Sequence, residues 1–384
     1  MSDFTGVWLT TFGPMELEQK GDRVHGTYRM GEAECRLDGT AKGNRLVFKY
    51  QEPSAAGNGS FELLRYGKFV GSWRQTSPAP DDPARRNHWW VGTRGFDGVW
   101  TTSFGPMRLI HEDDRVFGIY GDLAGFGAST IEGKFLQGTL EFDYQEPSVK
   151  GSGQFGLSAD LLSFQGTWQT EESSTSKTWE GRRELPRVGV RWLVVLEAYW
   201  EDHITETEYS FGGMLREFFA RITSIHVRQR YFTNAEGLAQ WCRDLAYLPE
   251  PTVLVIATHA HASEPVFVAR NGIIPPELLP EVLQYAGDVS LVHLSSCLPL
   301  DHDPENPWYG PLLPLCSVSG YGSAVDWAVS AILEFQYLDM ILARNLFPNE
   351  AAEQVKQLVG FAGDKTPTNS PYPAAKFRFF AKGK

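Results

Sequence analysis

The chain has 384 residues, of which 42% are hydrophobic and 21% charged, and its formal net charge is -12. This length is typical of about two or three domains whose cores need no disulfide or metal. The negative charge repels phosphate backbones, so we expect no nucleic-acid partner. The apolar runs are too short to cross a bilayer, and the first residues lack the pattern of a signal peptide, so we expect no membrane association.

The cysteines indicate a reducing compartment. Cys35, Cys242, Cys297 and Cys316 form no CxxC pair and show no metal-ligand spacing with histidine. Four scattered cysteines in a chain of this length do not resemble a disulfide framework. We therefore predict a cytoplasmic protein.

The first half of the chain contains an internal duplication. FTGVWLTTFGPM at residues 4–15 is matched by FDGVWTTSFGPM at residues 96–107, and DRVxGxY, YQEPS and FxGxW recur in the same order. Apolar and polar residues alternate between Gly-Asp, Gly-Asn and Asp-Gly pairs, which predicts roughly seven or eight short strands per copy. This number of strands suits a closed barrel or a strongly curled sheet.

The repeated residues favour a packed scaffold over a ligand-carrying barrel of the lipocalin or avidin type. They are mostly Gly, Trp and strand-forming residues, with Trp8 and Trp100 expected on the first strands and Trp73 and Trp168 on the last. The one polar feature kept in both copies, QEP after Tyr50 and Tyr144, is typical of a turn that ends a strand. We expect the copies to serve as structural or protein-binding modules.

Composition sets the domain boundaries. The segment rich in Pro and charge is interpreted as a linker at residues 79–95, between a first β repeat at residues 1–78 and a second at residues 96–184. From residue 188 to residue 384 the pattern changes to alternating strands and helices.

The second half predicts a mostly parallel sheet covered by helices on both faces. A hairpin is expected at residues 266–274, and the tail after residue 347 is compatible with either a last strand or a basic extension. In such sheets function gathers at the carboxyl ends of the strands. The expected strands span residues 190–200, 226–232, 252–261, 288–297 and 315–322, and the expected helices span residues 212–223, 234–248, 275–287 and 324–347.

Two reactive side chains stand at the ends of two of these strands. His259 closes the strand that begins at Thr252, and Cys297 closes the strand that begins at Asp288. If the strands are neighbours, an imidazole and a thiol meet at one rim of the sheet, as nucleophilic catalysis requires. The backbone N–H groups of Ala260 and Cys297 are the candidate oxyanion donors. The alternative is that Cys297 is a small core residue and His259 a satisfied polar group.

Along the chain, a strand that ends in Thr258-His259 is followed by a hairpin, a helix and a strand that ends in Ser295-Ser296-Cys297. This order resembles the caspase-like peptidase clan (clan CD), and most of all its bacterial CHAT-type branch. The resemblance covers residues 188–343 and implies a caspase-like α/β fold that cleaves peptide bonds without a metal or organic cofactor. It implies that His259 and Cys297 are the catalytic pair. Ser296 before Cys297 fits the family, whereas Ala260 stands where the family has glycine.

The sequence offers further candidates around this pair. His261 is the rival of His259, and a two-histidine metal site would have only Glu264 as a third ligand, so we expect no metal. In caspase-like folds the segment holding Asp326 and Trp327 helps to form the substrate groove; the alternative for Asp326 is a carboxylate at the start of the long helix. The loop after Cys297 carries three polar residues, Asp301, His302 and Asp303. In the clan such loops are mobile and can be cleaved or rearranged on activation; the alternative is that these residues are only solvated.

We therefore predict duplicated barrel-like β modules followed by a caspase-like cysteine endopeptidase. The partners would be a protein or peptide substrate and a regulatory protein recruited by the β modules. The alternatives are a catalytically inactive caspase-like scaffold, which the Ala260 departure keeps open, and a β-barrel that binds a small ligand.

Overall fold

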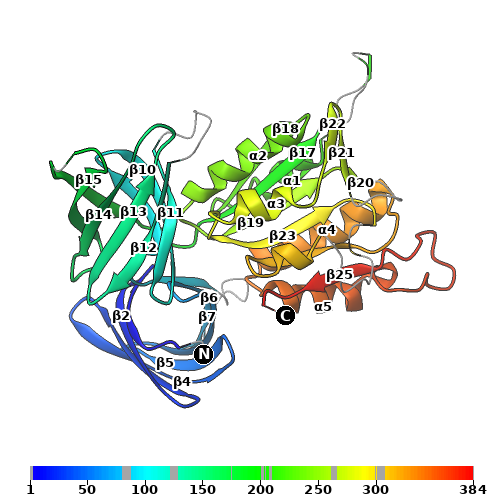
Figure 1. The fold of residues 1–384 in the computed structure, drawn as a ribbon. Coiled ribbons are helices and arrows are strands. Elements are labelled where there is room, and N and C mark those ends of the chain that lie inside the picture. Colours follow the sequence, from blue (N-terminus) through cyan, green and yellow to red (C-terminus); the bar gives the residue numbers. More distant parts are fainter. Residues whose placement is uncertain are drawn as a thin grey trace. The chain divides into compact units, whose positions relative to one another are not determined.

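The computed structural model divides the chain into two compact units, Met1–Gly189 and Val190–Lys384, each described by itself (Figure 1). No helix in the described part of the chain is both long and apolar enough to cross a membrane. The structure describes residues 3–79, 88–121, 129–173, 175–199, 203, 205–206, 210–260, 266–298, 300 and 308–383.

The first unit contains two closed antiparallel barrels in which each strand pairs with the next along the chain. The predicted alternation is present: in β3 every second residue from Val24 to Tyr28 is buried, as expected for strands with one face on a core. Closure removes the free strand edges. The first barrel consists of β1 (Gly6–Thr10), β2 (Gly13–Lys20), β3 (Arg23–Met30), β4 (Ala33–Lys42), β5 (Arg45–Gln51), β6 (Ala56–Arg65), β7 (Lys68–Ser77) and β8 (His88–Thr93).

The second barrel repeats this order, so the prediction of a closed barrel in each copy is confirmed. Its first strand, β9, pairs with both β10 and the last strand, β16. The strands are β9 (Gly98–Thr102), β10 (Gly105–Glu112), β11 (Arg115–Tyr120), β12 (Ser129–Leu136), β13 (Thr139–Gln145), β14 (Lys150–Leu157), β15 (Ser163–Thr170) and β16 (Lys177–Glu184).

Large aromatic side chains pack into a core in each barrel. Trp8 and Trp100 are fully buried, and each indole N–H donates to the backbone carbonyl four residues earlier. The guanidinium of Arg94 lies 4.4 Å from the centre of the Trp8 ring, and that of Arg183 lies 4.1 Å from the centre of the Trp100 ring. Arg94 directly follows β8 and Arg183 lies near the end of β16, so each cation–π contact joins the end of the last strand to the first strand of its barrel.

The QEP turns have the structural role that the sequence favoured. Tyr28 donates a 2.8 Å hydrogen bond to Glu52, and Tyr120 donates a 2.9 Å hydrogen bond to Glu146. In both copies the glutamate therefore ties the turn after the fifth strand to the third strand of its barrel.

The boundary between the two repeats lies later than the sequence analysis placed it. Part of the 79–95 linker, His88–Thr93, is strand β8, which pairs with β7 and β1 and closes the first barrel. Trp73 and Trp168 consequently lie on the seventh strands, and Trp90 and Trp179 occupy the last. The charged residues before β8 concealed a strand whose partners are distant in sequence.

The second unit is built on a mixed sheet in the order β18-β17-β19-β23-β24-β25. All pairs are parallel except that of β24 with β25, which confirms a mostly parallel sheet. A small second sheet holds β20, β21 and β22. The strands are β17 (Arg191–Ala198), β18 (Ile225–Phe232), β19 (Thr252–Ala257), β20 (His259–Ala260), β21 (Phe267–Ala269), β22 (Gly272–Ile274), β23 (Val289–Ser295), β24 (Ser317–Tyr321) and β25 (Phe377–Phe380).

Helices cover both faces of the larger sheet, as the apolar strands require. One core contains residues of α1, α4 and α5, and the other contains residues of α2 and α3. Asn234 caps α2 by accepting from the backbone N–H of Gly237, as its position predicts. The helices are α1 (Phe211–Phe219), α2 (Ala235–Asp244), α3 (Leu278–Leu283), α4 (Trp327–Leu342) and α5 (Pro348–Leu358).

In the second unit, one strand and one helix differ from those predicted from the sequence, and the structure shows which of the two alternatives holds for the tail. The strand expected at residues 252–261 ends at Ala257, because His259 and Ala260 pair with β21 in the small sheet. Helix α5 was not predicted, although Pro348 and Glu350 occupy favourable positions in its first turn. The tail ends in a strand, β25, rather than in a basic extension.

Candidate active site

The carboxyl ends of β19 and β23 lie side by side in the sheet. The strands pair in parallel, and Ala257 is the register partner of Ser295. The backbone N–H of Thr258 donates to the carbonyl of Ser295 at 3.2 Å, so the pairing extends past the end of β19. His259 and Cys297 each follow two residues after one of these register partners.

Cys297 is the one cysteine of the chain that is not buried. Burial raises the pKa of the Cys242 and Cys316 thiols to about 12 and also raises that of Cys35. Such thiols are poor nucleophiles at neutral pH, since the thiolate is the reactive form. Exposure therefore distinguishes Cys297 from the other three.

The backbone after β24 holds the thiol of Cys297. The backbone N–H of Val325 donates to Sγ at 3.5 Å, and Sγ lies 3.5 Å from the carbonyl oxygen of the same residue. Leu298 follows with a φ of +66° and donates its N–H to the carbonyl of Ser323 at 3.1 Å. A left-handed leucine is strained by about 1 kcal/mol or more, so the surrounding contacts maintain this turn.

His259 lies on the small sheet, where it pairs with Val268. The hydroxyl of Thr258 donates a 2.7 Å hydrogen bond to the carbonyl of Val268 and so fixes the point where the chain leaves the larger sheet. The histidine is exposed at the surface, yet desolvation lowers the pKa of its imidazole below the usual 6.5. A neutral imidazole can accept a proton, as a general base must.

Asp326 has a structural partner. It is the N-cap of α4, and its carboxylate accepts a 2.9 Å hydrogen bond from the backbone N–H of Val329. This is the helix-start role considered for it as the alternative to substrate binding. Trp327 begins the helix, is 41% exposed, and lies edge-on to Phe211 with 5.6 Å between ring centres.

Several candidates from the sequence lie outside the described residues: His261, Glu264, Asp301, His302 and Asp303. The structure therefore does not place the rival histidine or the polar loop after Cys297. Over the ranges that the structure describes, no three His, Cys, Asp or Glu side chains are grouped so that they could hold a metal ion.

A buried polar cluster at the ends of β23 and β24 was not evident from the sequence. Glu334, on α4, is fully buried and accepts hydrogen bonds from Ser295 and Tyr321. Its only signal in the sequence is a charged residue within the apolar stretch of a helix, and the spacing of that helix does not reveal the partner strands.

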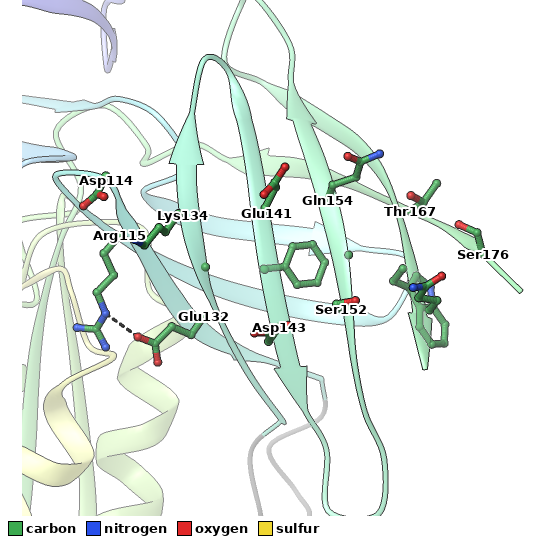
Figure 2. A pocket seen from close by; sticks show the side chains of 15 residues that line it. Asp114, Arg115, Glu132, Lys134, Glu141, Asp143, Ser152, Gln154, Thr167 and Ser176 are labelled. Carbon is green, nitrogen blue, oxygen red and sulfur yellow. Dashed lines mark hydrogen bonds and ion pairs between the residues drawn. The ribbon is translucent and has the colours of Figure 1, made fainter. Parts of the chain in front are cut away.

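The second barrel carries a polar groove of about 870 Å³ on the outside of β12–β15 (Figure 2). Its acidic side chains outnumber its basic ones, and Arg115 forms a 2.8 Å ion pair with Glu132 at one side. A related groove of about 400 Å³ on the first barrel contains Arg36, Asp38 and Lys49. The two grooves share equivalent positions such as Asp38 with Glu132 and Lys49 with Asp143, where the second pair has opposite charges.

Comparison with known proteins leaves the family of the chain open. No protein-family model matches the chain, and no curated protein matches it. A crystal structure of caspase-1 from Spodoptera frugiperda is similar with a TM-score of 0.35 and 9% identity, covering 50% of this chain and 86% of that chain. A similarity at this level supports no conclusion about family or activity.

Proposed function

We propose that the unit Val190–Lys384 is a caspase-like cysteine endopeptidase in which His259 and Cys297 form the catalytic dyad. The register of Ala257 with Ser295 carries the proposal, because it brings together the ends of the two adjacent parallel strands that His259 and Cys297 follow. Ala257 lies in the core that α1, α4 and α5 cover, and Ser295 bonds to α4. His259 and Cys297 each follow one of these strand ends by two residues, and the proposal takes their side chains to meet on that side of the sheet.

The chemistry follows from the two groups. The imidazole of His259 accepts the proton of the Cys297 thiol, and the thiolate attacks the carbonyl carbon of the scissile peptide bond. The imidazolium then donates that proton to the leaving amine, which leaves a thioester on Cys297 for water to hydrolyse. The lowered pKa of His259 suits a neutral base better than a preformed thiolate–imidazolium pair.

The oxyanion would be held by backbone N–H groups of Ala260 and Cys297, which follow the ends of the two strands. We propose Trp327 as a wall of the substrate groove because its side chain is exposed two residues after Val325, which contacts the thiol. Asp326 is a weaker candidate for substrate binding, since its carboxylate already caps α4.

A thiol-directed peptidyl probe tests this function. Wild-type protein should react with members of a set of peptidyl acyloxymethyl ketones that differ in the residue next to the reactive group, and peptide mapping should locate the adduct on Cys297. Cys297→Ala should abolish the adduct, and Cys242→Ala should not, since that thiol is buried. Equal labelling of wild type and Cys297→Ala would remove Cys297 as the nucleophile. An unlabelled, folded wild type would favour the inactive scaffold instead.

We propose that the barrels recruit a regulatory protein rather than carry a small ligand. Aromatic side chains occupy the described core of each barrel, and the grooves open on the outer surface. Charge-reversing substitutions of Glu141 and Asp143 should weaken capture of such a partner while leaving labelling of Cys297 unchanged.

A further inference from the structure

Glu334 is a fully buried carboxylate that joins three elements around the candidate nucleophile. Ser295, the last residue of β23, donates its hydroxyl to the two carboxylate oxygens at 2.8 and 3.0 Å. Tyr321, the last residue of β24, donates its hydroxyl to the same carboxylate at 2.9 Å. A buried carboxylate persists only where such donors replace water.

Both ends of this network lead to Cys297. Ser295 precedes Cys297 by two residues on the same strand end. The backbone carbonyl of Tyr321 accepts a 3.0 Å hydrogen bond from the backbone N–H of Leu300, and four residues after Tyr321 the backbone of Val325 contacts Sγ of Cys297. The carboxylate therefore holds the strand that delivers the thiol and the segment against which the thiol rests.

We propose that Glu334 is a positioning residue that fixes the orientation of the Cys297 thiol toward substrate. This inference rests on the peptidase function proposed for the same site. Nothing in the arrangement brings Glu334 into contact with substrate, because its side chain is completely buried. Its effect passes through Ser295 and Tyr321.

Further groups lie against this network. His293 Nε2 lies 3.2 Å from Glu334 Oε1 at an angle outside that of a hydrogen bond, and His293 Nδ1 lies 2.9 Å from the Ser319 hydroxyl. Burial, followed by the Glu334 charge and its hydrogen bond, raises the pKa of Tyr321 well above 10. A charge on Cys297 raises it further, so the thiol lies within electrostatic reach of the network.

Positioning and electrostatics predict opposite results when the charge is removed. Glu334→Gln deletes a buried negative charge from the network, and removing a negative charge near a thiol by itself favours the thiolate and faster reaction. Loss of orientation instead slows a reaction that needs the thiol, the base and the oxyanion donors in place together. A small alkylating agent such as iodoacetamide needs only the thiolate and therefore separates the two effects.

The test measures two rates for Cys297 in the full-length protein from pH 5 to 9. One is labelling by the peptidyl ketone that reacts best with wild type, resolved into its binding constant and its maximal rate, and the other is alkylation by iodoacetamide. For Glu334→Gln we expect the maximal peptidyl rate to fall roughly 10- to 100-fold, with alkylation unchanged or faster. Ser295→Ala should lower the same rate, and Ser295→Thr, which keeps the hydroxyl, should restore it.

Glu250→Gln is the matched control. This carboxylate is also buried, but it accepts from Trp192 beside the amino-terminal ends of β17 and β19, away from the strand ends that hold Ser295 and Tyr321. It should lower thermal stability and leave both rates of Cys297 at the wild-type value. Wild-type or faster peptidyl labelling in Glu334→Gln, or an equal loss in Glu250→Gln, overturns the proposal.

Two further outcomes are decisive. If Glu334→Gln does not fold, the comparison of Ser295→Ala with Ser295→Thr decides, and equal peptidyl rates in both and in wild type overturn the positioning role. If the peptidyl probes do not label Cys297 in folded wild type, the proposed function fails and this role fails with it. If wild type is labelled and the variants are labelled at the same rate, the proposed peptidase function is retained and only the positioning role of Glu334 is rejected.

Discussion

Asp97, just before the second barrel, forms two hydrogen bonds with the guanidinium of Arg65 on the first barrel, one of them 2.7 Å long. The carboxylate of Asp97 is fully buried, and Arg108 of the second barrel lies 3.7 Å from it. Burial opposes ionisation most strongly, but the charges of Arg65, Arg108 and Lys68 outweigh it and lower the pKa of Asp97. The first repeat has Thr5 at the equivalent position, so this pairing is present in one copy alone.

Replacing Asp97 should destabilise both barrels together. Asp97→Asn removes the charge that compensates the buried guanidinium groups, which typically costs about 3–5 kcal/mol of unfolding free energy. Urea unfolding followed by hydrogen exchange of peptides from residues 1–189 measures the loss. Glu132→Gln, which breaks an exposed pair with Arg115, should cost less than about 1 kcal/mol. Equal losses would show that the Asp97 pair contributes no more than a surface pair.

His111 should make the barrels sensitive to acid. Its Nδ1 accepts from the backbone N–H of Phe96 at 3.2 Å while Nε2 lies 2.9 Å from the carbonyl of Asp113, a pattern that one neutral tautomer satisfies. Burial lowers its pKa; the charge of Asp97 acts in the opposite direction, and Arg94 and Arg183 add to the lowering.

The sign of the His111 effect follows from the lowered pKa. Below its ordinary value of about 6.5 the unfolded chain takes up a proton that the folded barrel does not, so stability falls as the pH falls. The contribution reaches at most about 1.4 kcal/mol per pH unit and is fully present above pH 7. Thermal unfolding of wild type and His111→Gln between pH 7.5 and 5.5 tests this, and identical slopes would contradict it.

Two glycines on β14 should respond differently to alanine. A Cβ on Gly153 would lie 2.5 Å from the carbonyl oxygen of Thr167 and 2.6 Å from the Phe142 ring, whereas a Cβ on Gly156 would meet nothing closer than 3.7 Å. We expect Gly153→Ala to cost about 1–3 kcal/mol of unfolding free energy through overpacking. Gly156→Ala should be neutral or stabilise the fold, because it restricts the unfolded chain. A Gly153→Ala protein as stable as Gly156→Ala would refute the close packing at Gly153.

Labelling of Cys297 should depend on the protonation of His259. Because desolvation places the pKa of the imidazole below 6.5, the base is neutral at pH 7, and labelling by a peptidyl ketone should fall only as the pH drops further. His259→Ala should slow labelling at pH 7 by roughly 10²- to 10⁴-fold and remove this acid limb. An unchanged profile in His259→Ala would transfer the role of base to another group.

Local pattern was enough to predict the elements whose residues repeat with a clear period. The duplicated motifs gave two barrels, and the alternation of strands and helices after residue 188 gave the parallel sheet. Prediction from local pattern failed where residues distant in sequence determine the secondary structure. Strand β8 forms by pairing with β7 and β1, and His259 leaves the larger sheet by pairing with Val268.

The sequence by itself determined that a thiol and an imidazole each closely follow an apolar strand. Only the tertiary structure decided that those strands are neighbours in register, that Cys297 alone among the cysteines is not buried, and that Asp326 caps a helix. The same holds for Glu334, whose partners Ser295 and Tyr321 come from strands that precede its helix. The physical reason is that side-chain period is a local property, whereas strand order and burial arise from contacts between distant segments.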